Sequence, residues 1–192
     1  MTFLLGLTGS IGMGKSTTAA MFAAHSLPVW SADAAVHRLY ATGCAPLAAL
    51  FPSALQNGII SRDLLKRIIA QDPSALAQIE TIVHPLVAAD RANFIATTEA
   101  DITILDIPLL FENGTEAQFH ATLLVTAPAA IQRQRVLERP GMTAAHLQTI
   151  LTRQMPDAEK RKRATHIVET LDLPSTAAYV KALIAHIKAT HA

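Results

Sequence analysis

Short apolar runs alternate with stretches of helical periodicity along most of the chain. The apolar runs are rich in β-branched and aromatic residues and have the length of buried strands. They cover residues 3–7, 27–32, 101–107, 121–126 and 166–169. Because strands that alternate with helices form parallel sheets, the pattern predicts an α/β fold with a doubly wound, five-stranded parallel sheet.

One long segment, residues 42–94, departs from this alternation. Its periodicity is helical throughout, and it contains no convincing strand. Ser61 is placed to cap a helix over 62–69, and Asp72 with Pro73 begins another helix. We expect Pro85 to break or kink this second helix, since proline lacks the backbone N–H. The chain therefore carries a helical insertion between its second and third strands.

Composition predicts one folded domain, with or without an insertion. The 192 residues are 51% hydrophobic and 16% charged, with a mean hydropathy of +0.30. That is enough apolar side chain to bury a core, which excludes a disordered chain. The single cysteine, Cys44, excludes an internal disulfide. We expect it to pack as a small apolar side chain.

Charge and hydropathy also limit the partners. A net charge of +1 excludes a strongly basic nucleic-acid surface. Apolar runs stay well below the roughly 18 residues of a membrane span. The first cation is Lys15, so the basic region of a signal peptide is missing. We expect a cytoplasmic protein with no membrane or nucleic-acid partner.

The strongest chemical signal is the segment GSIGMGKS at residues 9–16, which fits the phosphate-binding pattern G-x-x-x-x-G-K-[ST]. It stands between the first predicted strand and a predicted helix over 17–24. Glycines let several backbone N–H groups point at one anion, and the helix N-terminus adds partial positive charge. Lys15 supplies a cation for the β- and γ-phosphates, and the Ser16 hydroxyl can ligate Mg²⁺.

Two alternatives compete with a triphosphate site at this loop. One is a glycine-rich turn that binds nothing. The other is a dinucleotide fingerprint, but Thr17 occupies its third glycine position, and such a turn has no use for Lys15 and Ser16. We therefore assign ATP phosphates to the following residues: Gly9, Ser10, Ile11, Gly12, Met13, Gly14, Lys15, Ser16 and Thr17.

Two carboxylates lie at the carboxyl ends of predicted strands, at the edge where open α/β sheets bind ligands. Asp33 comes just after the second strand, where it can take a proton from a hydroxyl that attacks the γ-phosphate. Asp33 is also placed to cap the helix over 34–40, and the two roles do not exclude each other. Asp106, near the end of the third strand, has the position of an acid that holds Mg²⁺ through water.

Arg139 stands just before Pro140 and Gly141, a hinge that would let its guanidinium reach the γ-phosphate as a lid closes. His84 is open to two interpretations, a ligand contact or a structural residue that is buried or ends a helix. Glu112 is equally open, since it either approaches the site or is a solvated helix residue.

The remaining basic residues carry less information. We expect Arg133 and the charged helix over 157–163 to face solvent, while Arg135 cannot be assigned. A phosphate loop, an acid after the second strand and mobile arginines together indicate phosphoryl transfer to a small hydroxyl acceptor. Switch GTPases are disfavoured because the chain has no N-K-x-D motif, and transporter-type ATPases because it has no Ser-Gly-Gly-Gln signature.

Across almost its whole length, the chain resembles the dephospho-coenzyme A kinases. The resemblance rests on LTGSIGMGKST at 7–17, Ala32-Asp33 followed by Val36-His37, IVHPL at 82–86, DIPLLFE at 106–112, and the arginines from Arg135 to Arg139 leading to Arg153-Gln154. The phosphate loop alone would identify only a superfamily. The acid, the His-Pro pair and the DIPLLFE segment together identify this family.

The resemblance implies transfer of the γ-phosphate of ATP to the ribose 3′-hydroxyl of dephospho-CoA, the last step in making coenzyme A. It implies a P-loop core over 1–32, 92–138 and 155–192, a helical acceptor domain over 33–91 and a lid over 139–154. Asp33 then resembles the base, with Lys15 and Arg139 as the other catalytic residues and Ser16 and Asp106 at Mg²⁺. The residues expected to contact the acceptor are Asp33, His37, Arg62 and His84. We expect a monomer or weak homo-oligomer.

Three positions depart from the family pattern. Ser31 stands where a second acid is common, and Ser61 replaces an aspartate before Arg62. The segment 164–170 lacks the usual aspartate and asparagine near the adenine, so we assign no side-chain contact to adenine there. Another small-molecule kinase, acting on a nucleoside or nucleotide, and a nucleotide-binding regulatory module without transferase activity are the alternatives.

Overall fold

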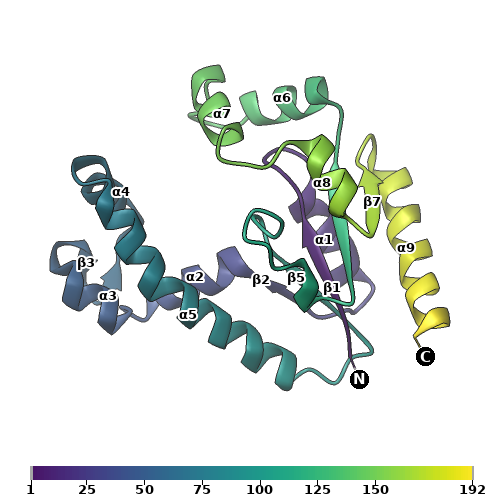
Figure 1. Ribbon diagram of the computed structural model, residues 1–192, viewed down its shortest axis with the longest axis horizontal. Helices are drawn as coiled ribbons and strands as arrows, with labels where there is room; N and C mark the ends of the chain where they lie inside the picture. Colours follow the sequence, from purple (N-terminus) through teal and green to yellow (C-terminus); the bar gives the residue numbers. More distant parts are fainter. Residues whose placement is uncertain (1, 192) are drawn as a thin grey trace. The chain divides into compact units, whose positions relative to one another are not determined.

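A computed structural model describes residues 2–191 of the chain, which divide into two compact units (Figure 1). The core unit holds the described residues up to Val29 and from Thr98 onward. The helical unit is Trp30–Thr97. Among the helices described, none has both the length and the apolar character that a bilayer span requires.

A five-stranded sheet forms the centre of the fold, in the order β2-β5-β1-β6-β7. β1 pairs in parallel with β5 on one side and β6 on the other, and β6 pairs in parallel with β7. The strands are β1 (Phe3–Thr8), β2 (Val29–Ser31), β5 (Ile102–Asp106), β6 (Ala121–Thr126) and β7 (His166–Glu169). The predicted α/β class and strand number are confirmed.

Two helices supply the apolar layer over one face of this sheet. They are α1 (Lys15–Ala24) and α9 (Leu173–Thr190), which lie beside each other in Figure 1. Phe22 of α1 and Leu183 of α9 join Leu5 and Leu123 of the strands in one buried cluster. Alternate residues of each strand point to this face, and the residues between them point to the opposite face. Leu105 and Leu124 are fully buried although they lie outside this cluster, so the central strands are buried on both faces.

The other elements of the core unit are short. They are η2 (Glu116–Gln118), α6 (Ala129–Leu137), α7 (Ala144–Leu151) and α8 (Asp157–Arg163). The Thr143 hydroxyl accepts a hydrogen bond from the His146 N–H at 3.1 Å and caps α7, which ends at Leu151.

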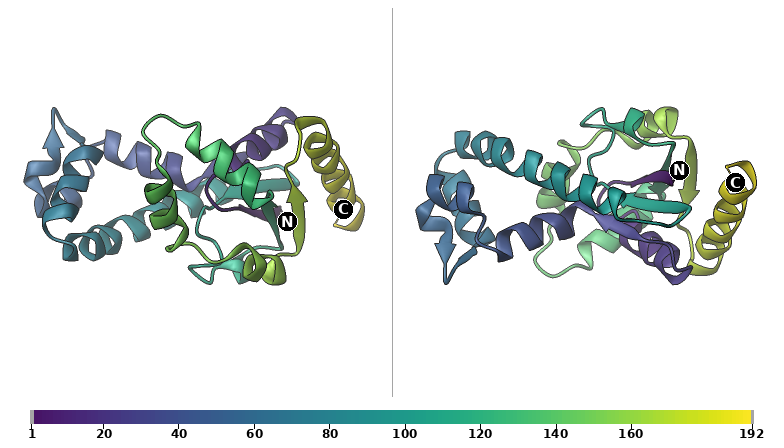
Figure 2. Two further views of the ribbon diagram at one scale, coloured as in Figure 1. Left: turned by 90° about the horizontal axis from the view of Figure 1, so that it is seen from above. Right: turned by 90° about the horizontal axis from the view of Figure 1, so that it is seen from below.

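Helices make up most of the helical unit: α2 (Ala32–Ala41), α3 (Ala45–Leu50), α4 (Arg62–Gln71) and α5 (Ser74–Ala96). Both views in Figure 2 show α2 and α5 running alongside each other. Leu47, Leu65 and Val83 form part of a second buried cluster, which also takes in Cys44, as expected for a small apolar side chain.

One prediction for the helical unit was wrong, and a second was wrong in part. A short turn, η1 (Pro52–Ala54), leads into an antiparallel hairpin of β3 (Leu55–Gln56) and β4 (Ile59–Ile60), where no strand was expected. Asn57 and Gly58 both have positive φ, the conformation that a two-residue hairpin turn requires. Of the two outcomes expected at Pro85, the break was wrong, because α5 runs through this residue without interruption. The kink stays a prediction.

Candidate active site

The phosphate loop joins β1 to α1, as the sequence predicts. Gly12 and Gly14 have φ values of +77° and +90°, a backbone conformation that residues with a Cβ rarely adopt. Gly14 is the N-cap of α1, so the next residue, Lys15, begins the helix. The loop thus places the positive N-terminal end of α1 next to the Lys15 side chain, and together they form a suitable binding site for an anion.

Lys15 and Asp106 form an ion pair, and both side chains are largely buried. The parallel register explains the pairing, because Leu7 of β1 lies opposite Asp106 of β5 and the loop follows β1 directly. The structure therefore brings together the predicted phosphate cation and the predicted metal-binding acid. Ser16, the other predicted metal ligand, is exposed in the first turn of α1.

Residues outside the loop brace its backbone, and sequence reasoning missed them. Gln132 of α6 donates from Nε2 to the Ile11 carbonyl at 2.8 Å, and the Ile11 N–H donates to Gln154 Oε1 at 3.2 Å. The Thr170 hydroxyl donates to the Met13 carbonyl at 2.8 Å. These partners lie more than 110 residues from the loop, so no local pattern reveals them.

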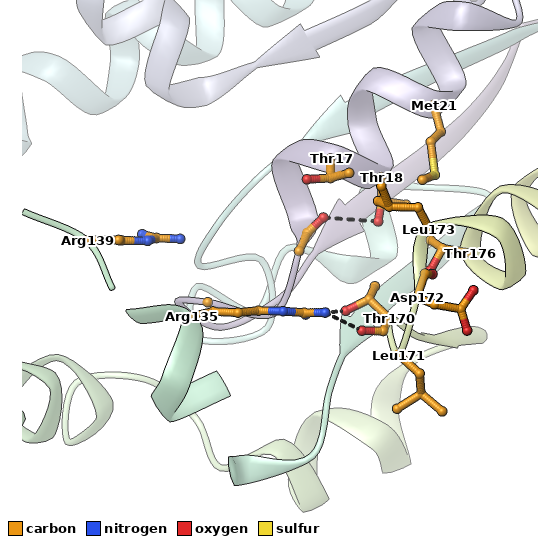
Figure 3. Close-up of a pocket in the computed structure, with 12 residues that line it drawn as sticks. Thr17, Thr18, Met21, Arg135, Arg139, Thr170, Leu171, Asp172, Leu173 and Thr176 are labelled. Atoms are coloured by element: carbon orange, nitrogen blue, oxygen red, sulfur yellow. Dashed lines mark hydrogen bonds between the residues drawn. The ribbon is translucent and has the colours of Figure 1, made fainter. Parts of the chain in front are cut away.

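A cavity of about 340 Å³ opens beside the loop (Figure 3). It is lined by Gly12, Gly14, Thr17, Thr18, Met21, Arg135, Arg139, Thr170, Leu171, Asp172, Leu173 and Thr176. Leu171 and Leu173 are exposed apolar side chains at its edge. Hydrogen bonds from the Ser175 backbone and hydroxyl hold the pKa of the Asp172 carboxyl below its ordinary value, which favours the charged form. The cavity therefore combines apolar surface, two guanidinium groups and a carboxylate.

The three arginines near this cavity differ in their surroundings. Arg135 donates to the Thr170 hydroxyl at 2.8 Å and to the Thr170 carbonyl at 2.6 Å, as Figure 3 shows. Arg139 is exposed and lines the cavity, in keeping with a cation that approaches the loop. Arg133 faces solvent, as expected.

Glu112 is not the solvated helix residue that one interpretation of the sequence expected, and its approach to the site stays untested. Its Oε1 lies 2.8 Å from Nζ of Lys160, a fully buried lysine, and it accepts from the Met155 N–H at 2.8 Å. The expectation that the charged helix over 157–163 is simply a solvated face was therefore wrong for Lys160. The pair ties the DIPLLFE segment to α8 and to the backbone next to Gln154.

The acceptor candidates belong to the helical unit. Asp33 is exposed in the first turn of α2, but the Ser31 hydroxyl caps that helix by accepting from Ala34 N–H at 3.4 Å. The cap assignment for Asp33 was therefore wrong, and its side chain is left for other contacts. His37 is exposed, and Arg62 lies over the Tyr40 ring at 5.7 Å.

His84 is exposed in the middle of α5. The alternative that it is buried or ends a helix was therefore wrong. Its role as an acceptor contact stays a prediction.

The chain has a parallel α/β sheet with the motif GxxxxGK[ST] after its first strand, and Lys15 pairs with Asp106 of β5, the neighbouring strand in the sheet. Together these features define a P-loop phosphotransferase. A model of the family described as dephospho-CoA kinase matches residues 3–172. The chain belongs to the dephospho-CoA kinase family.

Individual relatives agree with this assignment. A dephospho-CoA kinase from Cereibacter sphaeroides is 62% identical over 191 residues, which cover 98% of this chain and 97% of the relative. One from Jannaschia sp. is 56% identical, with 97% and 98% covered. A solved Thermus thermophilus structure superposes with a TM-score of 0.86 at 37% identity, covering 97% of this chain and 98% of that one.

Proposed function

We propose that this chain transfers the γ-phosphate of ATP to the ribose 3′-hydroxyl of dephospho-CoA, giving coenzyme A and ADP. The observation that carries the proposal is the complete phosphate loop with Lys15 against Asp106, in a chain of this family. The acceptor oxygen attacks the γ-phosphorus, the bond to the β–γ bridging oxygen breaks, and ADP leaves with that electron pair.

The donor half of the site is assigned to the core unit. The β- and γ-phosphates bind the loop amides and Lys15, which exchanges its ion pair with Asp106 for the phosphate oxygens. The nucleoside occupies the cavity beside Thr17 and Arg139, whose volume of about 340 Å³ is in the range of small-molecule sites. Arg139 closes on the γ-phosphate and helps to exclude water, so that ATP is not hydrolysed.

Ser16 and Asp106 are suited to Mg²⁺, because a hydroxyl and a carboxylate are the hard oxygen donors that this ion prefers. Among residues 2–191, no cluster of three or more acidic, histidine or cysteine side chains could hold a metal alone. That agrees with an ion held by one or two protein oxygens together with phosphates and water. When bound, it neutralises charge on the β- and γ-phosphates.

The acceptor half is assigned to the helical unit. Asp33 takes the proton of the 3′-hydroxyl, and its exposed position in the first turn of α2 leaves the carboxylate available. Arg62 supplies a cation for the phosphates of the acceptor, and His37 and His84 supply polar contacts. Residues 139–154 act as the lid. We further expect a cytoplasmic monomer or weak homo-oligomer.

The deciding experiment is a coupled assay of ADP release with Mg²⁺ and ATP, run with dephospho-CoA, nucleosides and nucleotides as separate acceptors. Turnover on dephospho-CoA with a product identical to coenzyme A by chromatography and ³¹P NMR is the expected result. Turnover on a nucleoside or nucleotide alone would establish the alternative kinase. Tight ATP binding with no phosphorylated product from any acceptor would support a regulatory module.

A further inference from the structure

Thr170 lies at a junction of hydrogen bonds just after β7. Its side chain is buried, with the residue 6% exposed, and its N–H donates to the Thr126 carbonyl at the end of β6 at 2.8 Å. Its hydroxyl contacts the Met13 carbonyl at 2.8 Å and the Thr126 carbonyl at 3.3 Å. Because a hydroxyl has one proton, the shorter contact to Met13 is the one that it donates to.

Arg135 fixes the direction of that proton. Its two terminal nitrogens donate to the Thr170 hydroxyl at 2.8 Å and to the Thr170 carbonyl at 2.6 Å. The guanidinium can only donate, so the hydroxyl oxygen is its acceptor. The single hydroxyl proton of Thr170 is therefore available for the Met13 carbonyl of the phosphate loop.

The contact at Met13 also sets the direction of the next N–H. The Met13 carbonyl and the Gly14 N–H belong to one peptide group, which is planar and trans, so they point in opposite directions. With the carbonyl held on Thr170, the Gly14 N–H is aimed away from Thr170. Gly14 has φ +90°, so this orientation depends on a backbone conformation that needs support.

Gln132 repeats the arrangement two peptide groups earlier. It is 7% exposed and donates to the Ile11 carbonyl at 2.8 Å, which by the same planarity turns the Gly12 N–H the other way. Each positive-φ glycine of the loop therefore follows a carbonyl that a buried side chain holds.

We propose that Thr170 is a positioning residue of the phosphate loop: its hydroxyl, oriented by Arg135, holds the Met13 carbonyl so that the Gly14 N–H points at the bound phosphates. The proposal rests on the loop's proposed role as the site of ATP phosphates. Thr170 also lines the cavity assigned to the nucleoside, but the role proposed here acts through the loop backbone, so the test compares phosphate binding with adenosine binding.

The test compares Thr170→Val, which keeps the branched shape without the hydroxyl, with Thr170→Ser, which keeps the hydroxyl. Dissociation constants are measured by calorimetry for ATP, inorganic tripolyphosphate and adenosine at fixed Mg²⁺. Thr170→Val should weaken the binding of ATP and of tripolyphosphate about tenfold, because the Gly14 N–H is no longer oriented to donate a hydrogen bond to the charged phosphate. Adenosine should bind within about twofold of the parent chain, and Thr170→Ser should restore tripolyphosphate binding.

Thr122→Val is the matched control, because Thr122 is 3% exposed and its hydroxyl contacts Thr165 of the core unit instead of the loop. If Thr170→Val does not fold, Thr170→Ala removes the same hydroxyl without placing a methyl group against a carbonyl. Unchanged tripolyphosphate binding in the folded variant, an equal loss of adenosine, or an equal loss in Thr122→Val would overturn the proposal. No acceptor is present, so the result is independent of which molecule is phosphorylated.

Discussion

The phosphate loop and the acceptor candidates are held in different ways. In the core unit, Gln132, Gln154 and Thr170 bond to the loop backbone, and Lys15 is paired with Asp106. In the helical unit, Asp33, His37 and His84 are exposed side chains on helices. The donor side is preorganised by contacts within the protein, whereas the acceptor side consists of polar groups open to solvent.

This difference indicates where binding energy is used. A braced loop presents its N–H groups without reordering when phosphate arrives, which is how electrostatic stabilisation becomes effective. Exposed side chains lose conformational freedom when a ligand orders them, so part of the acceptor's binding energy is consumed in that step. The effects of substitutions near the loop should therefore be measurable with ATP in the absence of the acceptor, whereas those in the helical unit should need the acceptor to show their effect.

Replacing Lys15 tests the donor side most severely. Lys15→Ala removes the phosphate cation and leaves the largely buried Asp106 without it. We expect kcat to fall about 10³-fold or more, because charge on the transferring phosphoryl group is no longer neutralised. The coupled ATP assay measures this, with Lys66→Ala, an exposed lysine of α4, as the control that should keep full activity. A Lys15→Ala enzyme with a tenth of normal turnover would contradict the assignment.

Asp33→Asn tests the acceptor side. We expect kcat to fall about 10²–10⁴-fold through loss of a general base, with the ATP dissociation constant unchanged. Asp63→Asn is a matched control, because Asp63 is also an exposed aspartate in the first turn of a helix, α4. Both variants lose a similar helix-dipole interaction, so only a catalytic role separates them. Near-normal turnover of Asp33→Asn would remove Asp33 from the mechanism.

Local pattern was sufficient to predict the sheet and the phosphate loop. The strand over 121–126 has the predicted bounds in the structure, because all six of its residues are buried and Pro128 follows two positions after its end. The hairpin at 55–60 was missed although Asn57-Gly58 is a standard turn signal, since its strands are only two residues each. The break expected at Pro85 was wrong because a long helix held by packing can tolerate a proline.

The contacts that shape the site were beyond sequence reasoning. Glu112 and Lys160 are 48 positions apart; Lys160 sits in a charged segment that looks solvated by itself, and Glu112 ends the apolar run IPLLF with no local sign of a partner. The bonds from Gln132, Gln154 and Thr170 to the loop likewise join distant segments. Asp33 and Ser31 are both acceptable helix caps by local rules, and only the backbone geometry at Ser31 decides between them.

The Glu112–Lys160 pair tests how far the support of the core unit extends. Glu112→Gln leaves the fully buried Lys160 without its counter-ion, which should lower the free energy of unfolding by about 3 kcal/mol or more. Glu116→Gln is the control, because Glu116 and its partner Arg163 are partly exposed and their pair should be worth about 1 kcal/mol or less. Denaturant unfolding followed by far-UV circular dichroism measures both. Equal losses would show that the burial of Lys160 has no energetic consequence.

Arg62→Ala asks whether an exposed side chain of the helical unit contributes to binding. Loss of its contact with the Tyr40 ring should cost under about 1 kcal/mol of stability. The KM for dephospho-CoA should rise about tenfold, since a hydrogen bond to a charged phosphate is lost, while the KM for ATP stays unchanged. Arg67→Ala on the same helix should change neither value. A KM for dephospho-CoA within twofold of normal would exclude Arg62 from the acceptor site.

The smallest effect concerns Asp90, a carboxylate that stabilises the helical unit. Its Oδ1 accepts from Trp30 Nε1 at 2.6 Å and from Arg38 at 2.7 Å, and the Trp30 bond is the main reason that the pKa of Asp90 is lowered from 3.8. Because the folded pKa lies below the unfolded value, this stabilisation is present above about pH 4 and is lost as pH falls through the folded pKa.

Trp30 is the sole tryptophan of the chain, so its fluorescence reports this bond directly. We expect a small change in emission as pH falls below about 4, absent in Asp90→Asn and retained in Asp63→Asn, which removes another exposed carboxylate of the helical unit. The same step in Asp90→Asn would show that the signal comes from general acid unfolding. Its absence in that variant would show that the helical unit keeps part of its support in a bond that acid below about pH 4 can break.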